Sequence, residues 1–292
     1  MILVTGATGH FGNATINFLL EKGVEAKRIS ALVRNEQSVD EFKKKGVKTL
    51  IGDYNNYNSL ATAFVGVEKL LLVSGSDLMN RTAQHLNVIN AAKEAGVKHM
   101  IYTSFQRRNE SENSPLGIVA QSHIQTEKSL KESGIDYTIL KNNLYMDFLP
   151  GFIGEKVAET GVIFVPAENG KVSAVLRSEM AEATANILVT DSHIGKEYDF
   201  TNTTAVTYHD IAKTVSEALE KPINYISPSV EEYGKTLASQ GVPAEVIGIF
   251  SSFAVAQAQG ELDKESTDLE KLLGRRPTTV QEFLGKLYTA NL

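Results

Sequence analysis

Short apolar runs alternate with longer stretches of helical spacing from residue 1 to about residue 140. The runs predict buried strands, and the stretches between them predict helices that cover both faces of a parallel sheet. The predicted strands are Ile2–Thr5, Ile29–Val33, Val47–Ile51, Lys69–Val73, His99–Thr103 and Asp136–Leu140, and the predicted helices span about 11–22, 36–45, 56–65, 80–95 and 118–133.

The alternation breaks after residue 142. Residues 196–201 predict one more strand, which brings the main sheet to about seven, while 162–165 and 171–176 look extended and 144–158, 178–189, 207–220 and 230–291 look helical. We predict an α/β fold with a Rossmann-like, doubly wound parallel sheet in a domain of residues 1–142, completed by the strand near 196–201. A smaller, mainly helical domain of residues 143–292 is expected to interleave with it and to leave a cleft.

A glycine-rich turn joins the first predicted strand to the first helix. Within it, Gly6 allows a tight turn, Gly9 lets the backbone approach a pyrophosphate, and Gly12 permits close contact between helix and strand. The following helix offers free N–H groups and a positive dipole end to the phosphates. The spacing resembles that of extended and atypical short-chain dehydrogenases, which bind nicotinamide dinucleotides. The residues expected to hold the cofactor here are Gly6, Thr8, Gly9, His10, Phe11 and Gly12.

The end of the second strand predicts which dinucleotide binds. A carboxylate at this place accepts a hydrogen bond from the ribose 2′-hydroxyl of NAD. Arg34 stands there instead, and a guanidinium pairs with a 2′-phosphate. NADP(H) is therefore predicted in preference to NAD(H), although the nearby Glu36 weakens this preference. A solvated surface arginine would give the same pattern.

Polar residues follow the next three strands. The resemblance implies that Asp53, with Tyr54 beside it, hydrogen-bonds the adenine amino group, although an aspartate that only forms a turn would look the same. Ligands bind at the carboxyl ends of parallel strands, which are expected to lie near the nicotinamide and its ribose. Small polar residues are also ordinary turn formers. The candidates at these two ends are Ser74, Gly75, Ser76, Thr103 and Ser104.

The usual catalytic pair of short-chain dehydrogenases is missing. These enzymes carry Tyr-x-x-x-Lys on the helix after the fifth strand, where the tyrosine protonates a carbonyl oxygen. The stretch after this strand resembles that of NmrA-like proteins, and it places Val119 at the tyrosine position and His123 at the lysine position. His123 is expected to contact the nicotinamide ribose or to assist protonation, with Glu127 one turn on to orient it. A buried His123–Glu127 pair with a structural role is the alternative.

The chain after the sixth strand is expected to line the substrate pocket. Asn142 or Asn143 is predicted to contact the nicotinamide carboxamide or the substrate oxygen, and we assign Asn142 to the cofactor. The catalytic candidates are then His123, Asn143 and Tyr145. Tyr145 is expected to stack on a planar substrate, or else to fill the core between the domains with Phe148. Weaker pocket candidates are Phe105, Gln106, Phe250 and Phe253.

Matching segments extend from Met1 to about Phe283, and the chain resembles the NmrA-like, atypical short-chain dehydrogenase/reductase family. Within that family it is most similar to NADPH-dependent quinone oxidoreductases and triphenylmethane reductases. The segments are Thr5–Gly9, Leu32–Asn35, Gly52–Tyr54, Gly66–Leu71, His123–Gly134, Asn142–Tyr145 and Asp268–Thr279.

The resemblance implies hydride transfer from NADPH to a quinone or a similar planar acceptor. Reduction of a quinone leaves a weakly basic hydroquinone anion that water can protonate. Such a reaction tolerates the loss of the tyrosine, whereas ordinary ketone reduction depends on general acid help of about 10²–10⁴-fold. Two alternatives stay open: a dinucleotide redox sensor that binds a transcription regulator without turnover, and a reductase of another substrate class.

Composition narrows this picture. The chain has 292 residues, of which 42% are hydrophobic, so it can bury a large core. It contains no cysteine, which excludes thiolate nucleophiles and cysteine-ligated metal sites, and we expect neither a metal nor a flavin. A net charge of -6 argues against direct nucleic-acid binding. No apolar run approaches the ~20 residues that span a bilayer. A cytoplasmic monomer or homodimer is expected.

Overall fold

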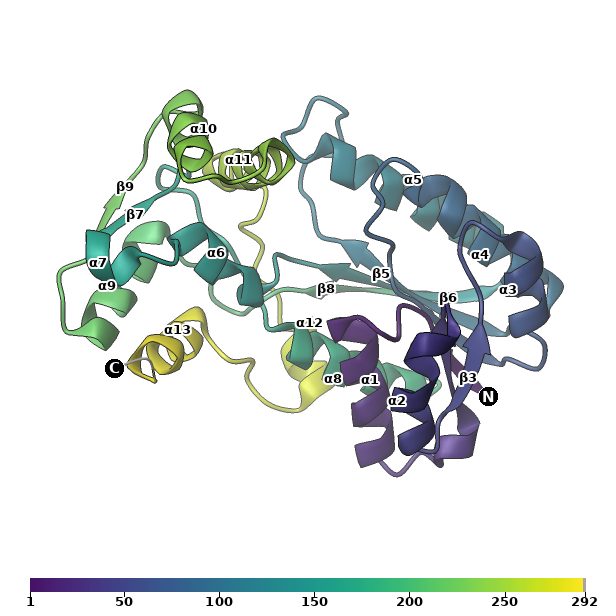
Figure 1. Cartoon of the computed structure of the whole chain (residues 1–292). Coiled ribbons are helices and arrows are strands. Elements are labelled where there is room, and N and C mark those ends of the chain that lie inside the picture. Colours follow the sequence, from purple (N-terminus) through teal and green to yellow (C-terminus); the bar gives the residue numbers. More distant parts are fainter. Residues whose placement is uncertain (291–292) are drawn as a thin grey trace.

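A parallel sheet runs through the middle of the molecule. The computed structural model describes residues 1–290, and its main sheet has seven strands in the order β3-β2-β1-β4-β5-β6-β8 (Figure 1). All neighbouring pairs are parallel. The predicted doubly wound sheet is confirmed. Its strands are β1 (Ile2–Val4), β2 (Ile29–Val33), β3 (Lys48–Ile51), β4 (Lys69–Leu72), β5 (His99–Phe105), β6 (Asp136–Asn142) and β8 (Lys196–Phe200).

Helices cover both faces of this sheet (Figure 1). On the central strands, Leu3 and Leu70 are buried against one layer, whereas Val4 and Leu71 are buried against the other. Strands buried on both faces are apolar throughout, which explains the unbroken apolar runs. No helix within residues 1–290 has the length and apolar character needed to cross a membrane. One layer contains α3 (Tyr57–Ala63), α4 (Arg81–Glu94) and α5 (Gly117–Glu132); the other contains α1 (His10–Glu21), α2 (Val39–Lys44), α8 (Arg177–Val189) and α12 (Asp268–Leu273).

The remaining elements pack around an apolar core of their own, which we call the second lobe. Phe152, Tyr208 and Leu284 are buried at its centre. The chain passes between the lobes several times, because β8, α8 and α12 belong to the main sheet although they follow residue 142. The second lobe consists of α6 (Leu149–Ile153), α7 (Val157–Thr160), β7 (Val162–Phe164), α9 (Tyr208–Leu219), β9 (Asn224–Ile226), α10 (Val230–Ser239), α11 (Ala244–Ala258) and α13 (Val280–Thr289).

Some local predictions for the second lobe are wrong. Residues 144–158 do not form one helix, because α6 begins only at Leu149, with Pro150 in its first turn, and Gly154, with a φ of 92°, ends it. Residues 171–176, which were expected to be extended, pair with neighbouring segments through isolated bridges and belong to no named strand. The short strand β9 was not predicted, because three residues are too few to show a periodic pattern.

Candidate functional site

The glycine-rich turn brings α1 close to the end of β1. Gly6 has a φ of 56°, in the left-handed region that favours glycine. A Cβ on Gly12 would lie 2.5 Å from the Gly6 carbonyl oxygen, so only glycine permits this approach. Gly9 is the N-cap of α1, and no side chain caps the helix there. The first N–H groups of α1 are therefore available to an anionic ligand.

A cavity of about 370 Å³ opens at this end of α1. Thr8, Gly9 and His10 line it, as the sequence predicts, whereas the Phe11 side chain is buried in the sheet core. Arg34 is exposed at the end of the neighbouring strand β2, and its guanidinium makes no ion pair with any described residue. The backbone cradle and this unpaired cation fit a dinucleotide with a 2′-phosphate.

Asp53 and Tyr54 follow β3 and have different environments. The Tyr54 hydroxyl contacts the Thr5 hydroxyl and donates to the Val73 carbonyl oxygen at 2.9 Å, so it ties together the ends of β1 and β4. One carboxylate oxygen of Asp53 accepts the Asn55 N–H at 2.8 Å and shapes the turn. Asp53 thus keeps an oxygen available for a ligand, whereas the Tyr54 hydroxyl is used within the fold.

The loop after β4 is held in place by its neighbours. The Ser74 N–H donates to the Thr103 hydroxyl at 2.9 Å, and the Gly75 N–H donates to Nε2 of His85 at 3.0 Å. The Gly75 carbonyl accepts from Nε of Arg81 at 2.7 Å. Burial lowers the pKa of His85 to about 3, which keeps the ring neutral and able to accept. The shape of this loop is therefore set before any ligand binds.

The stability of the protein is expected to fall as the pH drops below the ordinary histidine pKa of 6.5. His85 stays neutral in the folded chain, with a pKa of about 3, but takes up a proton in the unfolded chain near pH 6.5. The contribution of the neutral His85 ring to the free energy of unfolding is complete above pH 6.5. It decreases between pH 6.5 and pH 3, by up to about 1.4 kcal/mol per pH unit. Urea denaturation at several pH values measures this slope. His85→Gln should flatten it, and an unchanged slope in that variant would contradict the assignment.

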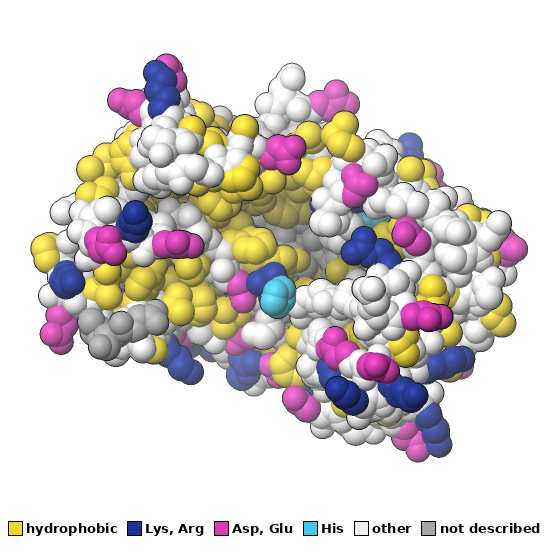
Figure 2. All heavy atoms as spheres, in the orientation of Figure 1, with side chains coloured by type: hydrophobic (Ala, Val, Ile, Leu, Met, Phe, Trp, Pro, Cys, Tyr) yellow, Lys and Arg dark blue, Asp and Glu magenta, His cyan; other side chains and the backbone are white. Residues whose placement is uncertain are grey.

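A second cavity, of about 540 Å³, lies between the carboxyl ends of the sheet strands and the second lobe. Figure 2 shows a hollow between the lobes with mainly hydrophobic walls. Apolar walls with a few polar groups suit a small apolar ligand. The predicted site residues that line this cavity are Ser74, Gly75, Ser76, Ser104, His123, Asn142, Asn143 and Tyr145.

Aromatic rings make up much of the cavity wall on the side of the second lobe. Phe152 stacks on Phe250 with ring centroids 4.6 Å apart, and Phe105 meets Phe253 edge-on at 6.1 Å. Phe105, Phe250 and Phe253 thus line the cavity. Gln106 does not, because its amide is turned to Glu261 and Asn143. Flat aromatic walls of this kind favour a planar ligand.

The two asparagines after β6 differ in what they can bind. The Asn142 amide is buried, and neither its nitrogen nor its oxygen has a hydrogen-bond partner among the described residues. The Asn143 amide donates to Gln106 at 2.6 Å and to the Leu262 carbonyl oxygen at 3.1 Å. Buried polar groups normally find partners, so Asn142 is the side chain left for a ligand. Beside it, burial raises the pKa of Tyr145.

His123 lies at the cavity but does not form the expected pair with Glu127. Its Nε2 lies 3.1 Å from Nη1 of Arg81, and its Nδ1 lies 2.6 Å from the Tyr102 hydroxyl. A guanidinium can only donate, so Nε2 accepts and Nδ1 carries the proton. Burial holds the pKa of His123 well below its ordinary value. A neutral ring with both nitrogens engaged is poorly placed to protonate a substrate.

Glu127 pairs with a residue that the sequence analysis did not consider. Arg107 donates to both of its carboxylate oxygens, at 2.8 and 2.9 Å, and the Ser104 hydroxyl donates to it as well. The Ser104 hydroxyl is therefore used within the fold. The expected orientation of His123 by Glu127 is wrong, because a loop guanidinium offers the carboxylate a stronger, two-point contact than an imidazole does.

Arg81 is the cavity residue that the sequence reasoning missed. It is the first residue of α4 and is only 7% exposed. Arg81, His85 and Val88 are spaced four and three residues apart, so they lie on the same, buried face of α4. This spacing could have indicated from the sequence that Arg81 points inward. An arginine on a buried helix face calls for a partner or a ligand.

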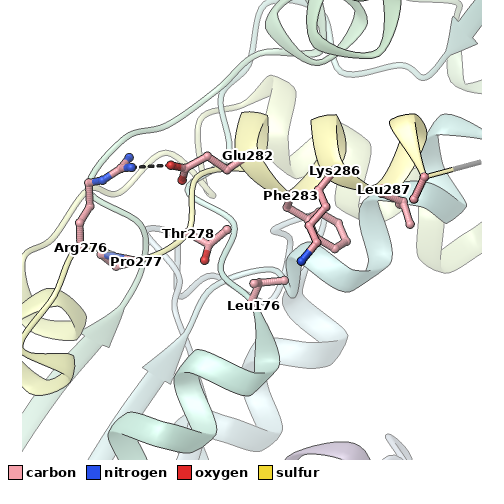
Figure 3. Close-up of a pocket in the computed structure, with 9 residues that line it drawn as sticks. Leu176, Arg276, Pro277, Thr278, Glu282, Phe283, Lys286 and Leu287 are labelled. Carbon is pink, nitrogen blue, oxygen red and sulfur yellow. Dashed lines mark hydrogen bonds and ion pairs between the residues drawn. The ribbon is translucent and has the colours of Figure 1, made fainter. Parts of the chain in front are cut away.

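A larger cavity, of about 730 Å³, lies elsewhere, between the start of α8 and α13 (Figure 3). None of the predicted site residues line it. Within its lining, Arg276 and Glu282 form an ion pair at 2.5 Å (Figure 3). The Thr278 hydroxyl donates to the Glu179 carboxylate. Within residues 1–290, no group of acidic and histidine side chains can hold a metal ion. Most of the predicted site residues instead lie at the carboxyl ends of the sheet strands, in the two cavities described above.

The fold, the glycine-rich turn and the adjoining cleft together define a dinucleotide-binding protein of the Rossmann type. The NmrA-like family model matches residues 1–284, and the chain belongs to this family. The family predicted from the sequence is confirmed.

Similar proteins cover the whole chain. It is 36% identical over 293 residues to quinone oxidoreductase 2 from Escherichia coli strain K12, covering 100% of both sequences. A Citrobacter sp. triphenylmethane reductase complexed with NADP(H) superimposes with a TM-score of 0.90 at 37% identity, covering 98% of this chain and 99% of that one. An NADPH-dependent quinone oxidoreductase from E. coli complexed with NADPH has a TM-score of 0.90 at 36% identity, covering 99% of this chain and 100% of that one.

Proposed function

We propose that this chain transfers a hydride from NADPH to a quinone or a similar planar acceptor. The observation that carries this proposal is the cleft at the strand ends, which combines aromatic walls with the loss of the usual tyrosine and lysine pair. Val119 lines it where short-chain dehydrogenases usually have a tyrosine, and His123 is neutral and hydrogen-bonded. Acceptors whose reduction needs no acid fit such a site, whereas ordinary ketones do not.

The residues at the sheet edge have separable tasks when the nucleotide binds. The free N–H groups of the first turn of α1 bind the pyrophosphate, Arg34 binds the 2′-phosphate, and Asp53 binds the adenine. Asn142 is the candidate for the carboxamide, because its buried amide makes no hydrogen bond of ordinary geometry within the described chain and interacts only with the Tyr145 phenol. NADPH, when bound, supplies the hydride. Two similar proteins form complexes with NADP(H) and NADPH, which supports this choice of cofactor.

The second lobe supplies the walls for the acceptor. Tyr145 and the phenylalanines of α11 enclose the cleft with apolar surface. Such walls exclude water and orient a flat acceptor against the nucleotide. The acceptor is therefore a small molecule, and we expect the protein to work in the cytoplasm as a monomer or a homodimer.

One experiment tests the proposed function directly. The protein is mixed with NADPH and with 1,4-benzoquinone, a triphenylmethane dye or no acceptor, and the loss of NADPH absorbance is followed. We expect loss that depends on the acceptor, and none with heat-denatured protein. Tight NADPH binding without any acceptor-dependent loss would instead identify a redox sensor.

Arg34→Asp is expected to weaken NADPH binding by about 10- to 100-fold, since hydrogen bonds to charged groups contribute about 1.5–3 kcal/mol. NADH binding should change little or improve, because a carboxylate at this place accepts the ribose 2′-hydroxyl. Fluorescence titration with both nucleotides measures the difference. Arg108→Asp, at an exposed arginine, is the matched control. An equal loss for both nucleotides would refute the 2′-phosphate role.

A further inference from the structure

Arg81 is a buried cation whose N–H groups are only partly used in hydrogen bonds. Its Nε donates to Gly75, and its Nη1 donates to Ser122 at 3.3 Å and to Nε2 of His123 at 3.1 Å. No hydrogen bond joins its Nη2 to another described residue, and the guanidinium lines the cavity between the lobes. Two N–H groups of Nη2 are therefore available at the cavity wall.

No carboxylate neutralises this charge. Within the described chain Arg81 forms no ion pair, and Asp77, which acts on it through space, is exposed and turned to Asn80. The buried Arg107, in contrast, is paired with Glu127. A buried charge is normally paired because removing it from water is costly. An unpaired guanidinium beside a cavity is thus ready to bind an anion supplied by a ligand.

The position of this cation matches what α5 lacks. His123 stands where the lysine of the usual catalytic pair is expected, and it carries no charge. The Arg81 guanidinium reaches the same place from α4, because Nη1 contacts the His123 ring. Its charge also acts on Tyr145, which faces the cavity, and opposes the rise in the pKa of that phenol that burial causes. A cation is therefore present in the cleft beside His123, supplied by α4 instead of α5.

We propose that Arg81 stabilises the negative charge that develops on the acceptor oxygen, and so selects neutral quinone-like acceptors over cationic dyes. This inference rests on the proposed function. Transfer of one hydride with its two electrons converts a quinone into a hydroquinone monoanion and leaves NADP⁺, and water then supplies the proton. A cationic dye takes the same hydride to a neutral product. Only the first reaction places an anion against the guanidinium.

The test compares both acceptors in one set of variants. Arg81→Met should lower kcat/KM for 1,4-benzoquinone by about 10²–10³-fold, the usual effect of losing an oxyanion donor. For a cationic triphenylmethane dye the loss should be at least about ten-fold smaller, since any disturbance of the loop after β4 or of NADPH binding lowers both reactions alike. Arg81→Lys, which keeps the charge, should recover part of the quinone activity. Arg108→Met, at an exposed arginine, is the control for net charge.

A binding measurement complements turnover. 4-Nitrophenol changes its absorbance on ionisation, and the wild-type protein should bind it as the phenolate at a pH where the free phenol is neutral. Arg81→Met should lose this shift, whereas Arg81→Lys, which keeps the charge, should retain part of it.

Three outcomes would overturn the proposal. Equal losses for quinone and dye would mean that Arg81 only holds the loop after β4, and a large loss of NADPH affinity would make it a cofactor contact. If Arg81→Met does not fold, Arg81→Lys and the phenolate shift in the wild-type protein decide, and absence of both effects refutes the role. If the wild-type protein reduces neither acceptor, the proposed function fails, and the phenolate shift still reports on Arg81.

Discussion

Gly12→Ala is expected to abolish NADPH binding and to lower the free energy of unfolding by about 1–3 kcal/mol or more, as overpacking of a tight site does. The new Cβ would lie 2.5 Å from the Gly6 carbonyl oxygen and 3.0 Å from the Ala7 Cα. These are backbone atoms, so no side chain can turn aside to relieve the contact. The start of α1 must move away from β1, and its free N–H groups move with it.

Gly9→Ala is the matched control in the same turn. Its Cβ would lie 3.3 Å from the same Gly6 oxygen, and the φ of Gly9 is −83°, which alanine adopts easily. We expect stability within about 1 kcal/mol of the wild type but weaker NADPH binding, because a methyl group keeps the pyrophosphate off the backbone. Urea denaturation and NADPH titration of both variants measure the contrast. Unchanged stability and affinity in Gly12→Ala would contradict the account of the turn.

Arg107→Met is expected to destabilise the protein by about 3–5 kcal/mol, the usual effect of leaving one buried charge without its partner. The Arg107 and Glu127 side chains are only 4% and 7% exposed, so water cannot replace the lost contact. Glu127 would keep a hydrogen bond from Ser104 but no cation. Urea denaturation measures the loss.

The double variant Arg107→Met, Glu127→Met separates pairing from packing. Replacing a buried ion pair by apolar side chains is often neutral or stabilising, so most of the lost stability should return. If the double variant is as unstable as the single one, the two residues are needed for their shape and not for their charge. A loss below about 1 kcal/mol in Arg107→Met would mean that the pair behaves as an exposed one.

The strands and the glycine-rich turn could be predicted because their signals are local. Runs such as Ile29–Val33 are apolar because both faces of that strand are buried. Gly12 is required because the start of α1 approaches the Gly6 carbonyl oxygen too closely for any Cβ. The strand near 196–201 was also predictable as a member of the main sheet. The helix expected over 144–158 failed because Pro150 and Gly154 interrupt an otherwise apolar stretch.

The sequence predicted where the candidate site residues lie in the chain, but not the hydrogen-bond and ion-pair partners of His123 and Glu127. His123 and Glu127 have helical i, i+4 spacing, which favours a contact on an isolated helix. In the folded chain Glu127 forms an ion pair with Arg107 instead, and His123 forms hydrogen bonds with Arg81 and Tyr102. These partners come from other elements, so their competition is invisible in the spacing.

The sequence by itself determined the parallel sheet, the dinucleotide turn, the basic residue after β2 and the absence of the usual tyrosine. The sheet and the turn depend on burial periodicity and backbone sterics within short stretches of chain, and the other two are residue identities at positions that those stretches define. The tertiary structure alone decided that α11 closes the cleft with aromatic rings and that Arg81 stands beside a neutral His123. Charge pairing and desolvation depend on distances between elements far apart in the chain, and only folding sets those distances.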